Sequence, residues 1–340
     1  MKGKNMQISN FIQTLISKAQ QLNKTIVLPE GEDKRVLDAA HYAAVNKIAK
    51  IIILGNEKDI NSYFSDNGWS LDGIQIINPA TSAKLPEYAE LLYNMRKEKG
   101  MTEEEAAKTA ADANYFGTLM IKSGHADGMV SGADHSTADT VRPALQIIKS
   151  ARKDRGVSAV FIARSQDGKI YYLSDCALNI NPNPQELAGI ALSTAETAIQ
   201  FGDMPKVAML SYSTYGSGKG ESVTKVREAT EIAKAALQTD EYNGKNIILD
   251  GELQADAALD NVVSAKKAPS SAINGEANVL IFPNIDAGNI GYKLLQRIGK
   301  AEMYGPLLQG LNAPINDLSR GCFTEDIVGA IAITVLQTQK

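Results

Sequence analysis

Histidine, cysteine and arginine are scarce in this chain of 340 residues. It has three histidines (His41, His125 and His135) and two cysteines (Cys176 and Cys322), and only nine of its 35 basic residues are arginine. No H-E-x-x-H motif occurs, and two distant cysteines make neither a disulfide framework nor a Cys-rich zinc site. We therefore expect no metal centre, and a chemistry that rests on carboxylates, hydroxyls, backbone amides and a few arginines.

The chain also lacks an excess of positive charge and a long apolar run. Its 35 Lys and Arg against 39 Asp and Glu give a net charge of −4, without the basic excess that nucleic-acid binding needs. Apolar runs such as 51–54 fall far short of the ~20 residues of a membrane span. Residues 1–10 are polar and contain no apolar signal region. We expect a cytoplasmic protein with no nucleic-acid or membrane partner.

What is present is typical of a soluble α/β protein. Apolar residues make up 44% and charged residues 22% of the chain, and its length corresponds to roughly two domains. Short β-branched runs alternate with longer helical patterns, which predicts mainly parallel sheets covered by helices. The expected strands are 25–28, 50–54, 128–131, 158–164, 170–174, 207–211, 246–250 and 278–282.

Two helices and one hairpin are marked by their end signals. The helix expected over 185–201 has Asn183 as a cap and Gly202 just beyond its end, and a second helix is expected over 221–237. The Asp167-Gly168 pair predicts an antiparallel hairpin between strands 158–164 and 170–174. The charged stretch 151–156 is the best candidate for a crossing between domains.

The loop from Gly132 to Arg142 combines glycine, hydroxyl side chains and an arginine placed at the start of an expected helix. Backbone amides, a helix dipole and a guanidinium there would suit a phosphate group. An ordinary loop in which Ser136 or Thr137 caps the helix is equally compatible with this composition. His135 could serve as a base, although a structural hydrogen bond is the commoner role of a single histidine.

The segment 316–326 before the last expected helix, 327–336, is the second candidate. Ser319 and Arg320 could hold an anion, with Asp326 close by as an acid or base. The alternative is that Thr324 caps the helix while Glu325 and Asp326 complement its dipole, and the residues alone favour it. Cys322 has no assignable histidine partner, and a buried free cysteine is the commoner case.

Two further features carry weaker signals. Residues 216–222 resemble a phosphate-binding Walker loop only superficially, because Gly220 stands where Ser or Thr is required. An anion near this loop and a plain solvent loop both remain open. Arg96 begins a basic turn on an expected helix, which is compatible with an anionic ligand or with a solvated face.

Taken together and in order, these motifs closely resemble the phosphate acetyltransferases, within the phosphate acetyl/butyryltransferase family. The resemblance covers essentially the whole chain, and its last motif is highly specific. The stretches that carry it are 24–31 (KTIVLPEG), 95–97 (MRK), 135–144 (HSTADTVRPA), 211–214 (SYST), 250–254 (DGELQ), 278–292 and 315–322 (INDLSRGC).

The resemblance implies reversible acetyl transfer between coenzyme A and inorganic phosphate in acetate metabolism, giving acetyl phosphate. It implies a three-layer, two-domain α/β fold similar to isocitrate and isopropylmalate dehydrogenases. Domain I would comprise residues 1–151 and 304–340, and the inserted domain II residues 152–303, with the active site in the cleft. It also implies a homodimer whose interface lies on domain II, and no bound cofactor, since coenzyme A and acetyl-CoA are substrates.

By the same resemblance, each candidate residue acquires a role. Asp326 would be the catalytic base, while Ser319 and Arg320 would hold the phosphoryl or acyl group. The contacts with coenzyme A or phosphate would come from Arg96, Arg142, His135, Ser136 and Thr137.

Three alternatives remain. A phosphate butyryltransferase differs only in the shape of its acyl pocket. A nicotinamide-dependent hydroxyacid dehydrogenase would share the fold, but it needs a metal-binding aspartate cluster and a nucleotide loop that we do not find. A non-catalytic acyl-CoA sensor, like the module appended to some malic enzymes, is disfavoured by the presence of Ser319, Arg320 and Asp326.

Overall fold

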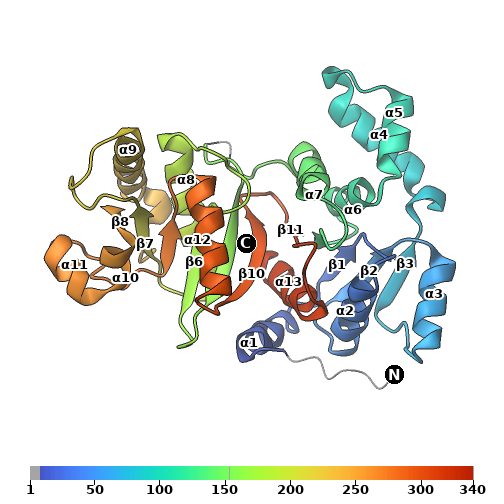
Figure 1. Cartoon of the computed structure of the whole chain (residues 1–340). Helices are drawn as coiled ribbons and strands as arrows, with labels where there is room; N and C mark the ends of the chain where they lie inside the picture. Colours follow the sequence, from blue (N-terminus) through green and yellow to red (C-terminus); the bar gives the residue numbers. More distant parts are fainter. Residues whose placement is uncertain (1–7, 153, 340) are drawn as a thin grey trace. The chain divides into compact units, whose positions relative to one another are not determined.

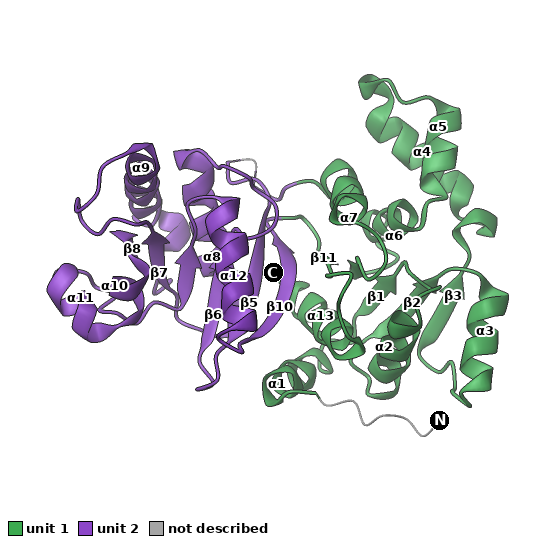
Figure 2. Cartoon of the chain, viewed as in Figure 1, with its two compact units in different colours: residues 1–149, 311–340 green, residues 150–310 purple. Residues whose placement is uncertain are grey.

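The computed structural model describes residues 8–152 and 154–339 of the chain. The expectation for the N-terminal segment therefore falls largely on residues 1–7, outside the described part. The chain divides into two compact units, residues 1–149 with 311–340 (unit 1) and residues 150–310 (unit 2) (Figure 2). The expected domain boundaries at 151 and 304 stay a prediction, and each unit is described by itself.

Unit 1 contains an all-parallel five-stranded sheet in the order β11-β4-β1-β2-β3. Its strands are β1 (Thr25–Leu28), β2 (Lys50–Leu54), β3 (Ile74–Ile77), β4 (Gly128–Ser131) and β11 (Ile315–Asp317). Its helices are α1 (Asn10–Ala19), α2 (Lys34–Val45), α3 (Glu57–Asp66), α4 (Leu85–Arg96), α5 (Glu103–Ala110), α6 (Ala113–Lys122), α7 (Thr137–Pro143) and α13 (Thr324–Gln337), with short turns η1 (Pro79–Thr81), η2 (Lys97–Lys99) and η3 (Ala144–Ile148).

Helices cover both faces of this sheet, as the unbroken apolar strands require. On one face Val27, Ile52 and Met129 form a core cluster with residues of α4, α6 and η3. Alternate strand residues point to the other face, where α2 and α13 pack on the sheet (Figure 1). Helix α13 is buried from Ile327 to Leu336, so its N-terminal residues are held on a fixed support.

Unit 2 contains a mixed six-stranded sheet in the order β10-β5-β6-β9-β7-β8. Its strands are β5 (Ser158–Arg164), β6 (Ile170–Ser174), β7 (Lys206–Leu210), β8 (Ile248–Leu253), β9 (Val279–Ile281) and β10 (Glu302–Gln309). Its helices are α8 (Pro184–Phe201), α9 (Glu221–Ala236), α10 (Ala255–Leu259), α11 (Asn261–Lys267) and α12 (Ile285–Arg297), with the short turn η4 (Asp240–Tyr242).

The expected α/β class, with mainly parallel sheets and one hairpin, is confirmed. Strands β5 and β6 pair antiparallel, and so do β10 and β5, whereas β6, β9, β7 and β8 pair in parallel. Strands β1, β2, β4, β5 and β6 have the expected bounds, and β7, β8 and β9 are shifted by one to three residues. The expected strands omit β3, β10 and β11.

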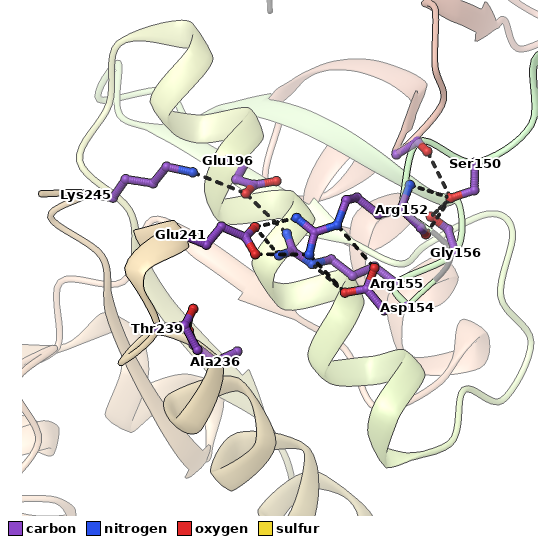
Figure 3. Close-up of polar contacts among 11 residues, drawn as sticks. Ser150, Arg152, Asp154, Arg155, Gly156, Glu196, Ala236, Thr239, Glu241 and Lys245 are labelled. Atoms are coloured by element: carbon purple, nitrogen blue, oxygen red, sulfur yellow. Dashed lines mark hydrogen bonds and ion pairs between the residues drawn. The ribbon is translucent and has the colours of Figure 1, made fainter. Parts of the chain in front are cut away.

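The charged stretch 151–156 lies at the start of unit 2 and belongs to an ion-pair network. Figure 3 shows the guanidinium groups of Arg152 and Arg155 gathered around the Glu241 carboxylate, with Glu196 beside them. The Arg155 side chain is only 3% exposed, and its guanidinium lies 3.2 Å from Glu196 and 5.4 Å from the centre of the Tyr242 ring. These contacts anchor the first residues of unit 2 to α8 and η4.

Candidate active site

Three loops of unit 1 follow neighbouring strands of its parallel sheet. Strands β1, β4 and β11 lie side by side, and Asp317 at the end of β11 is in register with Ser131 at the end of β4. Carboxyl ends of parallel strands share one edge, where ligands bind in open α/β sheets. Loops 29–33, 132–136 and 318–323 start from this edge, and the side chains of Glu30 and Arg35 link all three.

Glu30, in the first loop, holds the second loop. Its side chain is 2% exposed, and its carboxylate accepts hydrogen bonds from the backbone amides of Gly132, Ala133, Asp134 and His135 at 2.9–3.1 Å. The Nδ1 atom of His135 lies 2.9 Å from the same carboxylate. The backbone donors that the sequence offers to a phosphate are therefore occupied by a side chain of the same unit.

Arg35, in the first turn of α2, joins the three loops. Its guanidinium donates to the carboxylate of Asp33 and, at 2.7 Å, to the carbonyl oxygen of Ala133. Its Nη1 atom donates to the carbonyl oxygens of Arg320 and Cys322 at 2.8 and 2.9 Å. Arg35 thus holds the backbone of the segment that carries the candidate residues Ser319 and Arg320.

Asp317 is a buried carboxyl group between the second and third loops. It is 1% exposed, and one oxygen accepts a hydrogen bond of 2.7 Å from the Thr137 hydroxyl. Burial raises the pKa of Asp317 to about 6, although the hydrogen bond from Thr137 opposes the rise. The hydroxyl proton of Thr137 is therefore already donated to a residue of unit 1.

Asp326 lies in the first turn of α13 and accepts a hydrogen bond of 2.8 Å from the Phe323 backbone amide. Burial raises the pKa of Asp326, and this hydrogen bond opposes the rise. The expectation that Thr324 caps the helix is wrong, because Thr324 is the first helical residue and Phe323 is the cap position. The other half of that alternative is confirmed, since Glu325 and Asp326 lie in the first turn, where they complement the helix dipole. Ser319 and Arg320 are exposed just before this turn.

Two expectations for the second loop are settled by α7. Ser136 is the cap of this helix, and its hydroxyl and amide both donate to Asp139. Arg142 was expected at the start of a helix, but it lies in the last turn of α7. The error has a simple cause, because α7 begins at Thr137, directly after the loop. The positive end of the helix dipole and Arg142 therefore lie at opposite ends of α7.

Arg96 and Arg142 both lie near Tyr115. Burial raises the pKa of Tyr115, and the positive charges of these two arginines oppose the rise. The Nε atom of Arg96 is buried and has no hydrogen-bond partner. A cavity of about 420 Å³ opens beside Arg142; its lining residues are Glu105, Lys108, Thr109, Asp112, Tyr115, Asp139, Arg142 and Pro143.

The glycine-rich loop of unit 2 folds onto a carboxylate of its own unit. Glu252 accepts hydrogen bonds from the Ser213 hydroxyl, the Gly216 amide and the Arg227 guanidinium at 2.7–2.9 Å. Although burial opposes it, these bonds, led by Arg227, lower the pKa of Glu252 to about 2. The amide of Gly216 is thus occupied by a side chain.

The sequence-predicted residues form two groups within unit 1. Arg35 and Asp317 bring the loop of His135, Ser136 and Thr137 next to the segment of Ser319 and Arg320, which leads into Asp326. Arg96 and Arg142 form the second group. Asp139 connects the two groups, because it accepts a hydrogen bond from Ser136 and lines the cavity.

Sequence reasoning did not nominate Glu30, Arg35 or Asp317. All three stand in or near the stretches that resemble the family: Glu30 in the loop after β1, Arg35 in the helix that follows this loop, and Asp317 as the last residue of β11. That position was the available signal, because a polar residue after a parallel strand lies at the ligand-binding edge.

Both cysteines are free and buried, which is the commoner case for a free cysteine. Burial raises the pKa of Cys322 to about 11, although the nearby Arg35 opposes the rise. A thiol in this environment is a poor nucleophile at neutral pH.

Within residues 8–152 and 154–339, no cluster of three or more His, Cys, Asp or Glu side chains is placed to hold a metal ion. No helix in the same described part of the chain has the length and apolar character to cross a bilayer.

Comparison with known proteins agrees with the resemblance of the motifs. The model of a protein family described as phosphate acetyl/butaryl transferase matches residues 10–335. A phosphate acetyltransferase of Acetivibrio thermocellus is 48% identical over 337 residues, covering 97% of this chain and 98% of that protein. The crystal structure of a phosphotransacetylase from Streptococcus pyogenes aligns with a TM-score of 0.89 at 46% identity, covering 96% and 98% of the two chains.

A second solved structure, the EutD phosphotransacetylase from Staphylococcus aureus, aligns with a TM-score of 0.87 at 45% identity, covering 96% of this chain and 99% of that one. The fold and the matched family define an α/β acyltransferase enzyme. The chain belongs to the phosphate acetyl/butaryl transferase family.

Proposed function

We propose that the chain catalyses the reversible transfer of an acetyl group between coenzyme A and inorganic phosphate, with acetyl phosphate as the second acetyl carrier. Relatives that are 45–48% identical over almost the whole chain bear the name phosphate acetyltransferase. Coenzyme A, acetyl-CoA, phosphate and acetyl phosphate are its substrates, and all of them are anions. The site must therefore supply positive charge that is not already neutralised.

The arginines of unit 1 carry this proposal. The unit has four, and Arg35 is bonded to a carboxylate and three carbonyl oxygens. The other three are Arg96, Arg142 and Arg320, and no carboxylate within the described residues forms an ion pair with any of them. An unpaired guanidinium beside a cavity or at a strand edge is suited to bind a phosphate group through two parallel hydrogen bonds.

We assign the contacts with coenzyme A or phosphate to Arg96 and Arg142, and the phosphoryl or acyl group to Arg320 and Ser319. His135, Ser136 and Thr137 contact the same substrates. The Nδ1 atom of His135 faces Glu30, which leaves Nε2 of the ring for a substrate oxygen. Because the hydroxyl protons of Ser136 and Thr137 go to Asp139 and Asp317, these two residues act chiefly as acceptors and spacers.

The reaction proceeds through a ternary complex in which Asp326 accepts the thiol proton of coenzyme A. The thiolate attacks the carbonyl carbon of acetyl phosphate, the C–S bond forms, and the C–O bond to phosphate breaks. A free thiol has a pKa near 8.5 and an ordinary aspartate one near 3.9, a mismatch of about 6 kcal/mol in proton transfer. Burial raises the pKa of Asp326 and so reduces the mismatch. The charge of Arg320 stabilises the developing oxyanion and the leaving phosphate.

The active form is a cytoplasmic homodimer in this proposal, and its interface includes α12. Ile290, Leu294 and Ile298 are 59%, 52% and 76% exposed at a spacing of four residues, so they share one face. The opposite face of α12 is packed, since Tyr292 stacks on Phe161 with ring centres 4.3 Å apart. A second copy of the chain offers the same stripe, as a two-fold interface requires.

Release of free thiol from acetyl-CoA, measured with and without phosphate, tests the proposed activity. Thiol release should depend on phosphate and produce acetyl phosphate, and butyryl-CoA should be a poorer substrate. Preferred turnover of butyryl-CoA would replace the assignment with a phosphate butyryltransferase. No phosphate dependence with either thioester would remove the proposal.

Asp326→Asn tests the proposed base in the same assay. The asparagine oxygen still accepts the Phe323 amide, so the helix start is preserved. We expect kcat to fall by about 10²–10⁴-fold with little change in KM, as for loss of a general base. Asp72→Asn, an exposed carboxylate change in unit 1, is the matched control. Turnover like that of the wild type in Asp326→Asn would exclude Asp326 as the base.

A further inference from the structure

Arg35 is unusual among the arginines of the chain because all five of its N–H donors are engaged. The Nε–H and one Nη2–H donate to the two oxygens of Asp33, and the other Nη2–H donates to the Ala133 carbonyl. Both Nη1–H groups donate to carbonyl oxygens, those of Arg320 and Cys322. A guanidinium has five donors in a planar fork, so none is left for a substrate.

The segment 318–323 has few other anchors among the described residues. Its remaining hydrogen bonds are internal or reach only into α13: the Cys322 amide donates to the Ser319 carbonyl, and the Phe323 amide donates to Asp326. The side chains of Ser319 and Arg320 are exposed. The bonds from Arg35 therefore fix the backbone from which Ser319 and Arg320 project.

The other two residues that Arg35 contacts, Ala133 and Asp33, are also held in place by further hydrogen bonds. The Ala133 carbonyl belongs to the loop whose four amides are held by the buried Glu30. Asp33, the carboxylate partner, also caps α2 by accepting the Arg35 amide at 2.7 Å. The guanidinium thus connects segment 318–323 to two parts of the unit that are fixed by other bonds.

We propose that Arg35 is a positioning residue for the acyl transfer, one that sets the Ser319–Arg320 segment through backbone carbonyls and touches no substrate. This inference rests on the proposed function, which gives Ser319 and Arg320 their roles. A lysine has three donors on one atom and cannot reach the same four acceptors with the geometry of the fork. Misplacement of a reacting group by about 1 Å can reduce the rate about 100-fold.

Steady-state kinetics of Arg35→Lys and Arg35→Ala test the proposal. We expect kcat to fall about 10- to 100-fold in both variants, with KM for acetyl-CoA and phosphate within about threefold of wild type. Added guanidinium ion should restore part of the kcat of Arg35→Ala and none of that of Arg35→Lys. The matched control is Arg164→Lys, which changes a guanidinium paired to Glu302 in unit 2 and should keep wild-type kinetics. A large rise in KM with unchanged kcat would instead make Arg35 a substrate-binding residue and overturn the proposal.

Labelling of Cys322 provides a readout that needs no activity. The Cys322 thiol is buried, and its Sγ lies 3.9 Å from the Arg35 guanidinium. Loss of Arg35 should speed its reaction with a maleimide by at least about tenfold, while Cys176, fully buried in unit 2, stays unreactive. If the wild type lacks phosphate-dependent activity but Arg35→Ala speeds the labelling, the proposed function fails and the positioning contact stands. Unchanged labelling and unchanged kcat in both variants would overturn the positioning role alone.

Discussion

Two buried carboxyl groups at the edge of the unit 1 sheet, those of Glu30 and Asp317, differ in the number of hydrogen-bond partners around them. Glu30 is buried, and its carboxylate accepts hydrogen bonds from four backbone amides and lies 2.9 Å from the Nδ1 atom of His135. Asp317 is equally buried and has the Thr137 hydroxyl on one oxygen, while its other oxygen has no partner that meets hydrogen-bond geometry. Burial disfavours the charged form of a carboxyl group, and donors favour it. Burial raises the folded-state pKa of Asp317 to about 6.

Asp317→Asn should change how stability depends on pH. The pKa of Asp317 is about 6 in the folded chain and near 3.8 without the fold, so the charged form weakens the fold. This penalty is complete above pH 6 and is relieved as the pH falls toward 4. The wild type should therefore gain about 2 kcal/mol of unfolding free energy relative to Asp317→Asn between pH 7.5 and pH 4.5.

Urea denaturation of both proteins at the two pH values measures this difference. Asp72→Asn, which removes an exposed carboxylate, should follow the wild type. A constant difference between wild type and Asp317→Asn across the pH range would contradict the raised pKa.

At the scale of elements, the close approach of the β4 loop to the end of β11 depends on Gly132. Its φ is +106°, and a Cβ there would lie 2.3 Å from the Asp317 carboxylate and 2.6 Å from the Leu318 amide nitrogen. Gly132→Ala should cost about 3–5 kcal/mol, from left-handed strain together with overpacking. Gly124→Ala is the matched control, with a φ of +74° and nothing within 4 Å, and should cost only about 1–2 kcal/mol.

Chemical denaturation of the two alanine variants separates strain from overpacking, because only Gly132→Ala has both. Equal losses of unfolding free energy would show that the β4 loop can move away from β11 freely.

The sequence predicts the elements whose signals are local. Strands such as β1 and β2 are short runs that are apolar after their first residue, Thr25 or Lys50, and their bounds are correct to the residue. Strand β10 contains Gly305-Pro306, and β11 has only three residues, two of them polar. Neither has the apolar pattern of a strand, because their pairing with β5 and β4 supplies the order that their own residues do not.

The candidate site likewise contains residues that the sequence marks and contacts that only the fold creates. Arginines and the Ser319–Asp326 segment are visible in the sequence because their residue types and the family motifs mark them. Glu30 bonds a loop about 100 residues away, and Arg35 bonds that loop and a segment about 285 residues away in the chain. No local pattern encodes such contacts. The misplacement of Arg142 was a local error, since a helix capped by Ser136 begins at Thr137 and reaches Arg142 only in its last turn.

At the scale of the whole molecule, the two units use arginine differently. In unit 2, four of the five arginines form an ion pair with a carboxylate; these are Arg152, Arg155, Arg164 and Arg227. In unit 1 the guanidinium groups other than Arg35 have no such partner within the described residues. A net charge of −4 is thus compatible with anionic substrates, because recognition depends on a few unpaired cations and not on the total charge.

The proposed homodimer gives a prediction for the whole molecule. In a two-fold interface the same patch of each copy meets its counterpart, so a charge placed on the α12 stripe lies near its own copy. Ile290→Glu combined with Leu294→Glu would place two pairs of like charges in an apolar contact and should dissociate the dimer. Light scattering after size-exclusion chromatography should give twice the 36.5 kDa of one chain for the wild type and a single chain for the variant.

Val45→Glu is the control for this experiment, because Val45 is an apolar residue at the end of α2, 60% exposed, in the other unit. A stable interface buries about 800 Å² on each partner, which is more than three side chains supply, so neighbouring residues of unit 2 must take part. Dissociation by the α12 pair and not by Val45→Glu would therefore place α12 inside that area. A dimer that withstands the α12 pair would move the interface to another face, and a monomeric wild type would remove the homodimer while leaving the proposed chemistry of unit 1 intact.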